Sequence, residues 1–178
     1  MDRERLLTNL RSFGSESDAA AIALADLGDC ESLPAILGAI ARDCGWEVIP
    51  DEKIAAFVRL ADAGAVTLLV EYLERLDEAE LEHDAGDIGD EFWRVQTAIR
   101  RILVGIGPPV VEPVRAALAK TDNRFTRECL AQALVPQLGI CILWGGEALW
   151  FVWFDSAVGR DEVGAAVFFA GAYRCRSN

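Results

Sequence analysis

The single histidine of this 178-residue chain lies in its most acidic segment. His83 is flanked by Glu82 and Asp84, and residues 77–91 contain eight acidic residues and no basic one. Carboxylate oxygens suit a hard divalent cation, but the spacing of an EF-hand loop is absent. A structural zinc site needs more His or Cys ligands than this segment has, and a Ser–His–acid triad would depend on His83 alone. We therefore interpret the segment as a solvated acidic loop and predict neither a metal site nor a catalytic residue.

Two other patterns could carry chemistry. Gly105-Ile-Gly107 has the spacing of a phosphate-binding loop, but Pro108 and Pro109 follow it, and proline has no N–H group to donate to a phosphate. We interpret it as a helix stop. The cysteines show no Cys-x-x-Cys spacing, and we expect them to be small buried side chains in a reduced protein. They are Cys30, Cys44, Cys129, Cys141 and Cys175.

The acidic balance of the chain restricts its partners. The net charge is −12, and residues 135–178 contain only four acids and three bases, so the other 25 acids and 14 bases lie in residues 1–134. Such a charge repels a nucleic-acid backbone and complements a basic protein. The first thirty residues lack the pattern of a secretory signal. We expect a cytoplasmic protein with no cofactor that binds a basic protein, and we expect neither nucleic acid nor membrane as a partner.

Apolar residues recur in stripes that have helical spacing. The three stripes are Leu33, Ile36, Leu37 and Ile40; Val66, Leu69, Val70 and Leu73; and Val111, Val114 and Leu118. Each follows another apolar helix and a short break, which is typical of a helical solenoid in which each unit buries its apolar face on its neighbours. We expect helices over residues 2–13, 19–27, 33–42, 52–62, 65–76, 91–104, 110–120 and 124–134.

Capping residues mark the expected helix ends. Ser17 or Asp18, Ser32, Asp51 and Asn123 are expected to cap N-termini, because their side-chain oxygens can accept from the first N–H groups of a helix. Gly28 is expected to end the second helix, since glycine readily adopts the left-handed conformation found there.

The acidic run lengthens one repeat, and we expect it to be an exposed loop, because insertions in solenoids often fall on the binding face. Trp46 and Trp93 are expected to fill the core, although a partly exposed indole would be a binding hot spot. Arg94, Arg100 and Arg101 are expected to pair with nearby acids on a solvated helix face. The predicted partner-binding residues are Glu71, Glu74, Glu78, Glu80, Glu82, Asp84, Asp87, Asp90, Glu91 and Trp93.

The periodicity ends at Leu134, so we divide the chain into helical repeats at 1–134 and an apolar segment at 135–178. Residues 135–154 hold three of the five tryptophans and one charge, Glu147. Four alternatives remain for this stretch. The favoured one is an irregular final repeat with Leu149, Val152 and Trp153 as its stripe. The others are a hairpin that turns at residues 145–146, a membrane insertion, and a shifted reading frame.

Two segments resemble a known family. Residues 25–43, Ala-Asp-Leu-Gly-Asp-x-x-Ser-Leu-Pro-Ala-Ile-Leu-x-Ala-Ile-x-x-Asp, are similar to a HEAT repeat, as are residues 107–122. The closest likeness is to the short HEAT-like repeats of phycobilisome lyases and their relatives, and it covers about residues 18–134. The resemblance implies an all-α, right-handed α-α solenoid of HEAT-like helix pairs with an irregular C-terminal segment.

The resemblance leaves several functions open. The family includes protein binders, bilin-attachment chaperones, a DNA glycosylase branch and an iron hydroxylase branch. One histidine cannot supply the paired His-Glu motifs of the hydroxylases, and an acidic repeat region contradicts the basic groove of the glycosylases. We predict a non-catalytic scaffold, adaptor or inhibitor, such as a toxin-neutralising protein. The alternative is a bilin lyase-like or chromophore-handling chaperone. The apolar segment 135–178 could also join copies of the chain into a homo-oligomer.

Overall fold

The computed structural model describes residues 2–46, 49–81, 89–137, 141–145 and 148–152. Up to Gln137 this described part of the chain forms eight α-helices, as many as the periodicity predicts. They are α1 Arg3–Asn9, α2 Ser15–Asp26, α3 Leu33–Cys44, α4 Asp51–Leu60, α5 Ala65–Leu81, α6 Gly89–Ile106, α7 Val111–Leu118 and α8 Arg124–Gln137. Short 3-10 turns, η1 Cys30–Ser32 and η2 Pro108–Val110, lead into α3 and α7.

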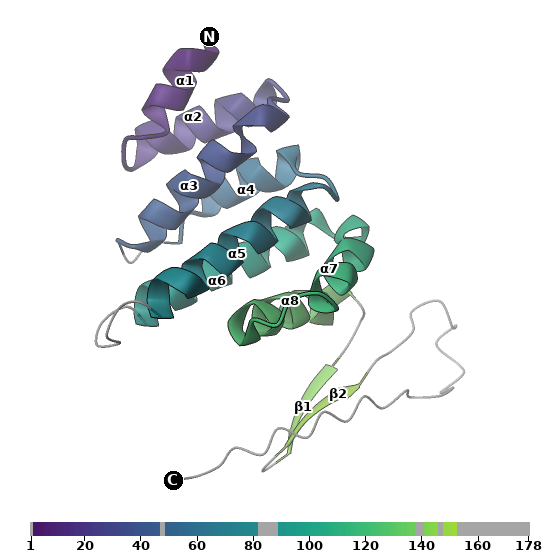
Figure 1. The fold of residues 1–178 in the computed structure, drawn as a ribbon. Coiled ribbons are helices and arrows are strands. Elements are labelled where there is room, and N and C mark those ends of the chain that lie inside the picture. The colour runs from purple at the N-terminus through teal and green to yellow at the C-terminus, as the bar shows by residue number, and fades with distance from the viewer. Residues whose placement is uncertain (1, 47–48, 82–88, 138–140, 146–147, 153–178) are drawn as a thin grey trace.

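The helices are stacked in chain order (Figure 1). Helices α2, α4, α6 and α8 contact one another in succession. Each of the other four packs on this row: α1 on α2, α3 on α4 and α6, α5 on α6 and α8, and α7 on α8. The core therefore runs through the stack, and the connections between helices lie at its two ends.

The predicted apolar stripes face this core. All four residues of the first stripe are buried, from Leu33 to Ile40. In the second stripe Val70 is half-buried and the other three residues are buried, whereas in the third only Val114 is fully buried. The third stripe is the weakest because α7 is short, and residues 111 and 118 stand at its ends.

Two of the predicted helix ends are confirmed. Gly28 has φ +68°, its N–H donates to the carbonyl of Ala25, and the N–H of Asp29 donates to the carbonyl of Leu24. This pair of bonds is the Schellman motif that ends a helix. At the start of α8, the Asn123 side-chain oxygen accepts from the N–H groups two and three residues further on, which is the expected N-cap.

The other predicted caps are wrong, because the side chains have different partners. Helix α2 begins at Ser15, so Ser17 lies inside it, where its buried hydroxyl donates to the carbonyl of Leu10. Ser32 precedes α3 but donates backwards to the carbonyl of Asp29, and Asp51 is the first helical residue after Pro50. The carboxylate of Asp18, the remaining candidate, forms an ion pair with Lys53 instead.

The predicted loop at 77–91 is wrong at both of its ends. Helix α5 continues to Leu81, and α6 already begins at Gly89. The added residues of α5 include Glu, Ala and Leu, which favour a helix, and this preference outweighs the repulsion between neighbouring acids. Residues 82–88, including His83, lie outside the described residues.

The segment after α8 contains paired strands. Strands β1 Cys141–Gly145 and β2 Ala148–Val152 are antiparallel, with Cys141 opposite Val152 and Gly145 opposite Ala148. The structure thus agrees with the hairpin alternative, although Gly145 belongs to a strand and not to the turn. The favoured helical repeat is wrong at Leu149 and Val152, and Trp153 lies outside the described residues. No helix in the described part of the chain is long and apolar enough to cross a membrane.

Candidate functional site

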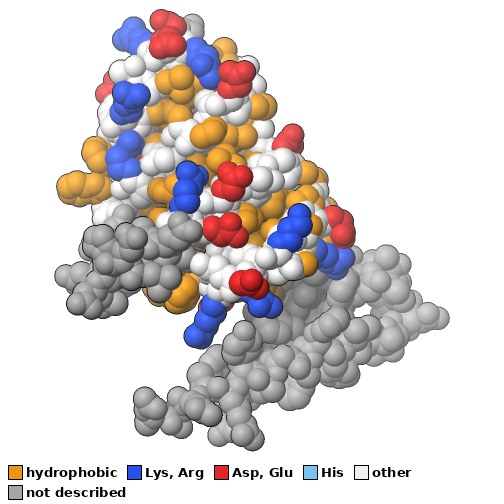
Figure 2. Space-filling view, viewed as in Figure 1, with side chains coloured by type: hydrophobic (Ala, Val, Ile, Leu, Met, Phe, Trp, Pro, Cys, Tyr) orange, Lys and Arg blue, Asp and Glu red, His pale blue; other side chains and the backbone are white. Residues whose placement is uncertain are grey.

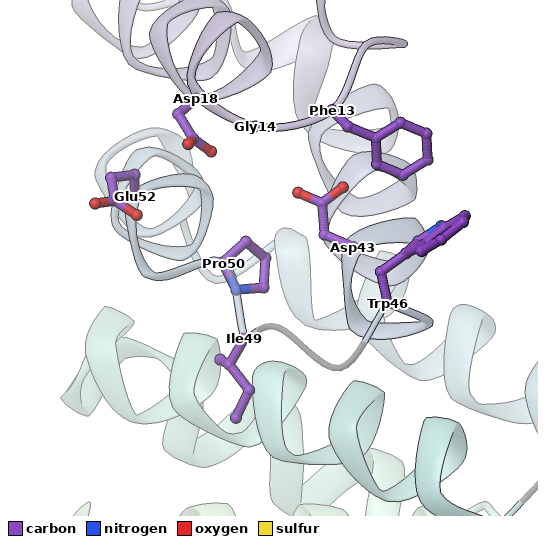
Figure 3. Close-up of a pocket in the computed structure, with 8 residues that line it drawn as sticks. All are labelled: Phe13, Gly14, Asp18, Asp43, Trp46, Ile49, Pro50 and Glu52. Atoms are coloured by element: carbon purple, nitrogen blue, oxygen red, sulfur yellow. The ribbon is translucent and has the colours of Figure 1, made fainter.

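A cleft of about 490 Å³ opens at one end of the stack, where the α1–α2 connection, the end of α3 and the start of α4 meet (Figure 3). It combines aromatic and aliphatic side chains with three carboxylates. Its lining residues are Phe13, Gly14, Asp18, Asp43, Trp46, Ile49, Pro50 and Glu52. This volume lies within the range of small-ligand sites in proteins.

Two exposed aromatic rings form one wall of the cleft. Phe13 is 52% exposed and Trp46 is 70% exposed, and their ring centroids lie 5.6 Å apart in an edge-to-face arrangement. The first helix was expected to extend to residue 13, and core filling was expected for Trp46. Both predictions are wrong, because α1 ends at Asn9 and α3 ends at Cys44, so both aromatic residues lie beyond a helix end.

Arg42 holds the aromatic wall in place. Its Nη2 donates to the carbonyls of Leu10 and Ser12, at 2.8 Å each, and its guanidinium lies 4.8 Å from the centroid of the Phe13 ring. One side chain of α3 therefore satisfies two carbonyls of the α1–α2 connection and supports the ring that follows them. A charged donor makes such hydrogen bonds stronger than neutral pairs.

A fully buried lysine supports the acidic wall. Lys53, on α4, has no exposed surface, and its Nζ forms ion pairs with Asp18 of α2 and, at 2.8 Å, with Asp43 of α3. Figure 3 shows the carboxylates of Asp18 and Asp43 directed toward one another across the space above Pro50. A buried charge requires such pairing, so this cluster fixes the relative positions of three helices. Glu52, the third carboxylate, has no ion pair with any residue that the structure describes.

None of the described residues that line this cleft is a predicted partner-binding residue. Glu71 is exposed and Glu74 is half-buried on α5. Glu78 and Glu80 fall in the last turns of α5, and Asp90 and Glu91 fall in the first turn of α6. Glu82, Asp84 and Asp87 lie outside the described residues.

The adjoining ends of α5 and α6 lie at the same end of the stack as the connections α1–α2 and α3–α4 (Figure 1). A hydrogen bond of 2.9 Å from Arg94 Nε to the carbonyl of Cys44 joins α6 to the end of α3, two residues before Trp46. We call residues 77–81 and 89–91 the acidic end. The structure thus brings the backbone of the acidic end and the two connections that form the cleft to one edge of the molecule.

Trp93 is 49% exposed, so the expectation that it fills the core is wrong. It borders a much smaller cavity of about 20 Å³ between α6 and α8, together with Gln96, Arg100 and Gln132. Arg100 donates to the Gln132 side chain at 2.7 Å, and Arg101 forms an ion pair of 2.7 Å with Asp51. The predicted pairing with acids is therefore confirmed for Arg101, whereas Arg94 and Arg100 donate to neutral oxygens.

Three further observations concern metal binding, the cysteines and the surface charge of the described residues. Among the described residues, no three His, Cys, Asp or Glu side chains are grouped so that they could hold a metal ion. Cys44 and Cys129 are buried as predicted, but Cys30 is exposed, which makes the prediction wrong there. The face of the stack seen in Figure 2 mixes acidic with basic side chains, so the acidic excess of the chain is not gathered on that face.

Little in the amino-acid sequence indicated the residues that build the cleft. Stretches of ordinary helical sequence separate Asp18, Asp43 and Lys53 from one another. The position of Lys53 beside Asp51 and Glu52 predicts an exposed side chain. The one usable signal was Trp46, which follows a glycine directly after an expected helix end.

Comparisons with protein-family models, with curated proteins and with solved structures find no match for this chain. The likeness to HEAT repeats rests on the residues of segments 25–43 and 107–122.

Proposed function

We propose that this chain is a HEAT-like α-solenoid that binds a basic protein partner and catalyses no reaction. The stacking supports the solenoid part of the proposal, because α2, α4, α6 and α8 contact one another in succession and the other helices cover this row. A solenoid is a common frame for protein binding, since its repeated connections place variable side chains along one edge.

The cleft is the observation that carries the binding function. Aromatic residues, tryptophan above all, are enriched among the residues that contribute most to binding at protein interfaces, and here two exposed rings lie together in one cleft. The backbone of the acidic end lies at the same edge of the stack as the two connections that form the cleft, and residues 77–91 contain eight acids and no base. A basic partner would be attracted over a distance by the net charge and would then dock on Phe13 and Trp46.

A chromophore-handling chaperone has weaker support. The cleft is large enough for part of a tetrapyrrole, but Asp18, Asp43 and Glu52 line it, and they would repel the propionate groups of a bilin. Absorbance of a bilin mixed with the protein provides the test. A red shift together with increased fluorescence would favour the chaperone over the protein binder.

The binding proposal is tested with a defined probe. A fluorescein-labelled 15-residue peptide of alternating basic and Gly or Ser residues is titrated with the protein, and its anisotropy is recorded at low and high salt. We expect saturable binding that weakens as salt screens the charges, and no binding of the same peptide with Glu at the basic positions. The matched protein variant carries Ser or Asn in place of the acids of residues 77–91 and should bind more weakly. Binding that ignores both salt and this change would contradict the proposal.

A further inference from the structure

We propose that the cleft is the anchor pocket for one arginine side chain of the basic partner. This inference rests on the proposed function and adds the group that the partner inserts. It assigns the cleft walls separate roles: Trp46 and Phe13 contact the planar face of the guanidinium, and Glu52 and Asp43 accept its N–H groups.

The aromatic wall already binds a guanidinium from within the chain. Arg42 lies 4.8 Å from the centroid of Phe13, a distance at which a cation is attracted by the electrons of an aromatic ring. Trp46 stands edge-to-face to Phe13 and is the more exposed of the two. Tryptophan is the most effective aromatic partner for a cation, so the neighbouring ring offers a second, better surface to an incoming arginine.

The carboxylate wall keeps an unsatisfied negative charge. Lys53 and Arg42 contribute two positive charges beside the three carboxylates of Asp18, Asp43 and Glu52, which leaves an excess of one negative charge. Glu52 is the carboxylate without an ion pair among the described residues, and it is exposed at the rim. Asp43 is held through both oxygens, Oδ2 by Lys53 at 2.8 Å and Oδ1 by Arg42 at 3.5 Å, so its geometry is fixed before any partner arrives. Each carboxylate oxygen has a second lone pair that can accept a further N–H.

An arginine satisfies these walls better than other cations. A guanidinium is planar, so it stacks on a ring, and its five N–H donors form a fork that matches a carboxylate. A lysine ammonium is compact and strongly hydrated, so it gains less from an apolar wall. A metal ion lacks a set of three suitable ligands in the described part of the chain.

The size and position of the cleft favour an arginine on a protein over a free small molecule. The volume of about 490 Å³ leaves room for neighbouring backbone of a partner beside one side chain. The backbone of the acidic end lies at the same edge of the stack as the α1–α2 and α3–α4 connections, so flanking basic residues of the partner would meet further acidic residues there.

The test compares three peptides that differ at one position. Each has the same flanking lysines and serines, and the centre is arginine, lysine or citrulline, the neutral isostere of arginine. We expect the arginine peptide to bind the wild-type chain about tenfold more tightly than the citrulline peptide, and the lysine peptide to lie between them.

Two variants remove the pocket and two matched variants leave it intact. Trp46→Ala and Glu52→Gln should each lower the affinity for the arginine peptide about tenfold and abolish the preference over citrulline. Phe125→Ala and Asp122→Asn, which change exposed residues outside the cleft, should stay within about twofold of wild type. Circular dichroism confirms that each variant is folded, and Glu52→Gln is nearly isosteric.

The outcomes separate this inference from the proposed function. If the peptides bind in a salt-dependent way but ignore Trp46→Ala, Glu52→Gln and the central residue, the anchor pocket is wrong and the basic-partner proposal stands. If Trp93→Ala has the larger effect, the anchor lies on α6 and the inference is overturned. If N-acetyl-arginine amide binds as tightly as the peptide, the ligand is a small molecule and not a protein. If no basic peptide binds even at low salt, both proposals fail.

Discussion

The two halves of the helix stack treat buried polar side chains in different ways. In the half formed by α1–α4, Lys53 is completely buried but has carboxylate partners on α2 and α3. The buried atom without a hydrogen-bond partner among the described residues of this half is Arg42 Nε, on a guanidinium whose Nη2 donates to two carbonyls. In the half formed by α5–α8, the Gln96 side chain is 5% exposed, and its Nε2 has no hydrogen-bond partner among the described residues. The first half has a cleft of about 490 Å³ and the second a cavity of about 20 Å³. Paired charges thus accompany the open site, although the densest run of acids in the sequence belongs to the second half.

The largest expected effect is on Lys53. Changing Lys53→Met leaves Asp18 and Asp43 near one another without their shared cation. Breaking a buried ion pair by removing one partner costs about 3–5 kcal/mol in the free energy of unfolding. Urea denaturation followed by circular dichroism measures this loss. The variant should also bind the arginine peptide more weakly, because Asp43 is no longer held in place.

The exposed pair between Arg59 and Asp26 is the matched control. The two side chains are 52% and 60% exposed, so water screens their attraction. Arg59→Met should change the free energy of unfolding by less than about 1 kcal/mol. An equal loss of unfolding free energy in Arg59→Met and Lys53→Met would show that burial of the lysine does not make its ion pairs more stabilising than an exposed pair.

The second effect concerns Arg42, which supports the aromatic wall. Arg42→Met removes the donors to the carbonyls of Leu10 and Ser12 and the cation beside Phe13. We expect a loss of about 1–3 kcal/mol in the free energy of unfolding, since hydrogen bonds to a charged group are worth about that much. Hydrogen exchange should show faster opening of the α1–α2 connection. Unchanged exchange there would mean that packing alone holds Phe13.

A smaller effect is expected at the start of α8, in the other half. Asn123→Ala removes the oxygen that accepts from two N–H groups of the first turn. Loss of such a cap costs about 1 kcal/mol. Thermal unfolding measures the change, and the affinity for the arginine peptide should stay as in wild type. A weakened affinity would show that the two halves are coupled.

The helices were largely predictable because the spacing of apolar residues indicates which side chains are buried. The first apolar stripe is buried throughout, and the caps at Gly28 and Asn123 depend only on adjacent backbone. Predictions failed where a side chain has a partner outside the helix that it was expected to cap. Ser17 bonds to Leu10 and Asp18 pairs with Lys53, 35 residues away, so neither caps α2.

The cleft was much less predictable, for the same physical reason. Its walls come from residues between positions 13 and 52, and no short segment contains more than a few of them. The acidic run could be recognised in the sequence because its residues are contiguous. The groups around a cavity are brought together by the fold and need not be contiguous. Trp46 stood out as a residue type, whereas its exposure depends on where α3 ends.

The smallest expected effect, at Gln96, tests whether the two halves differ in how they satisfy buried polar side chains. Gln96→Met keeps the length of a buried side chain on α6 and removes the Nε2 donor that has no partner among the described residues. Removing an unsatisfied buried donor should leave the free energy of unfolding within about 1 kcal/mol of wild type, or slightly raise it. The adjacent cavity of about 20 Å³ has room for about one water molecule. A loss above about 2 kcal/mol in urea denaturation would mean that Gln96 is satisfied, and a water in this cavity is the partner within reach. In that case ion pairs hold the buried lysine of the first half, and solvent satisfies the buried amide of the second.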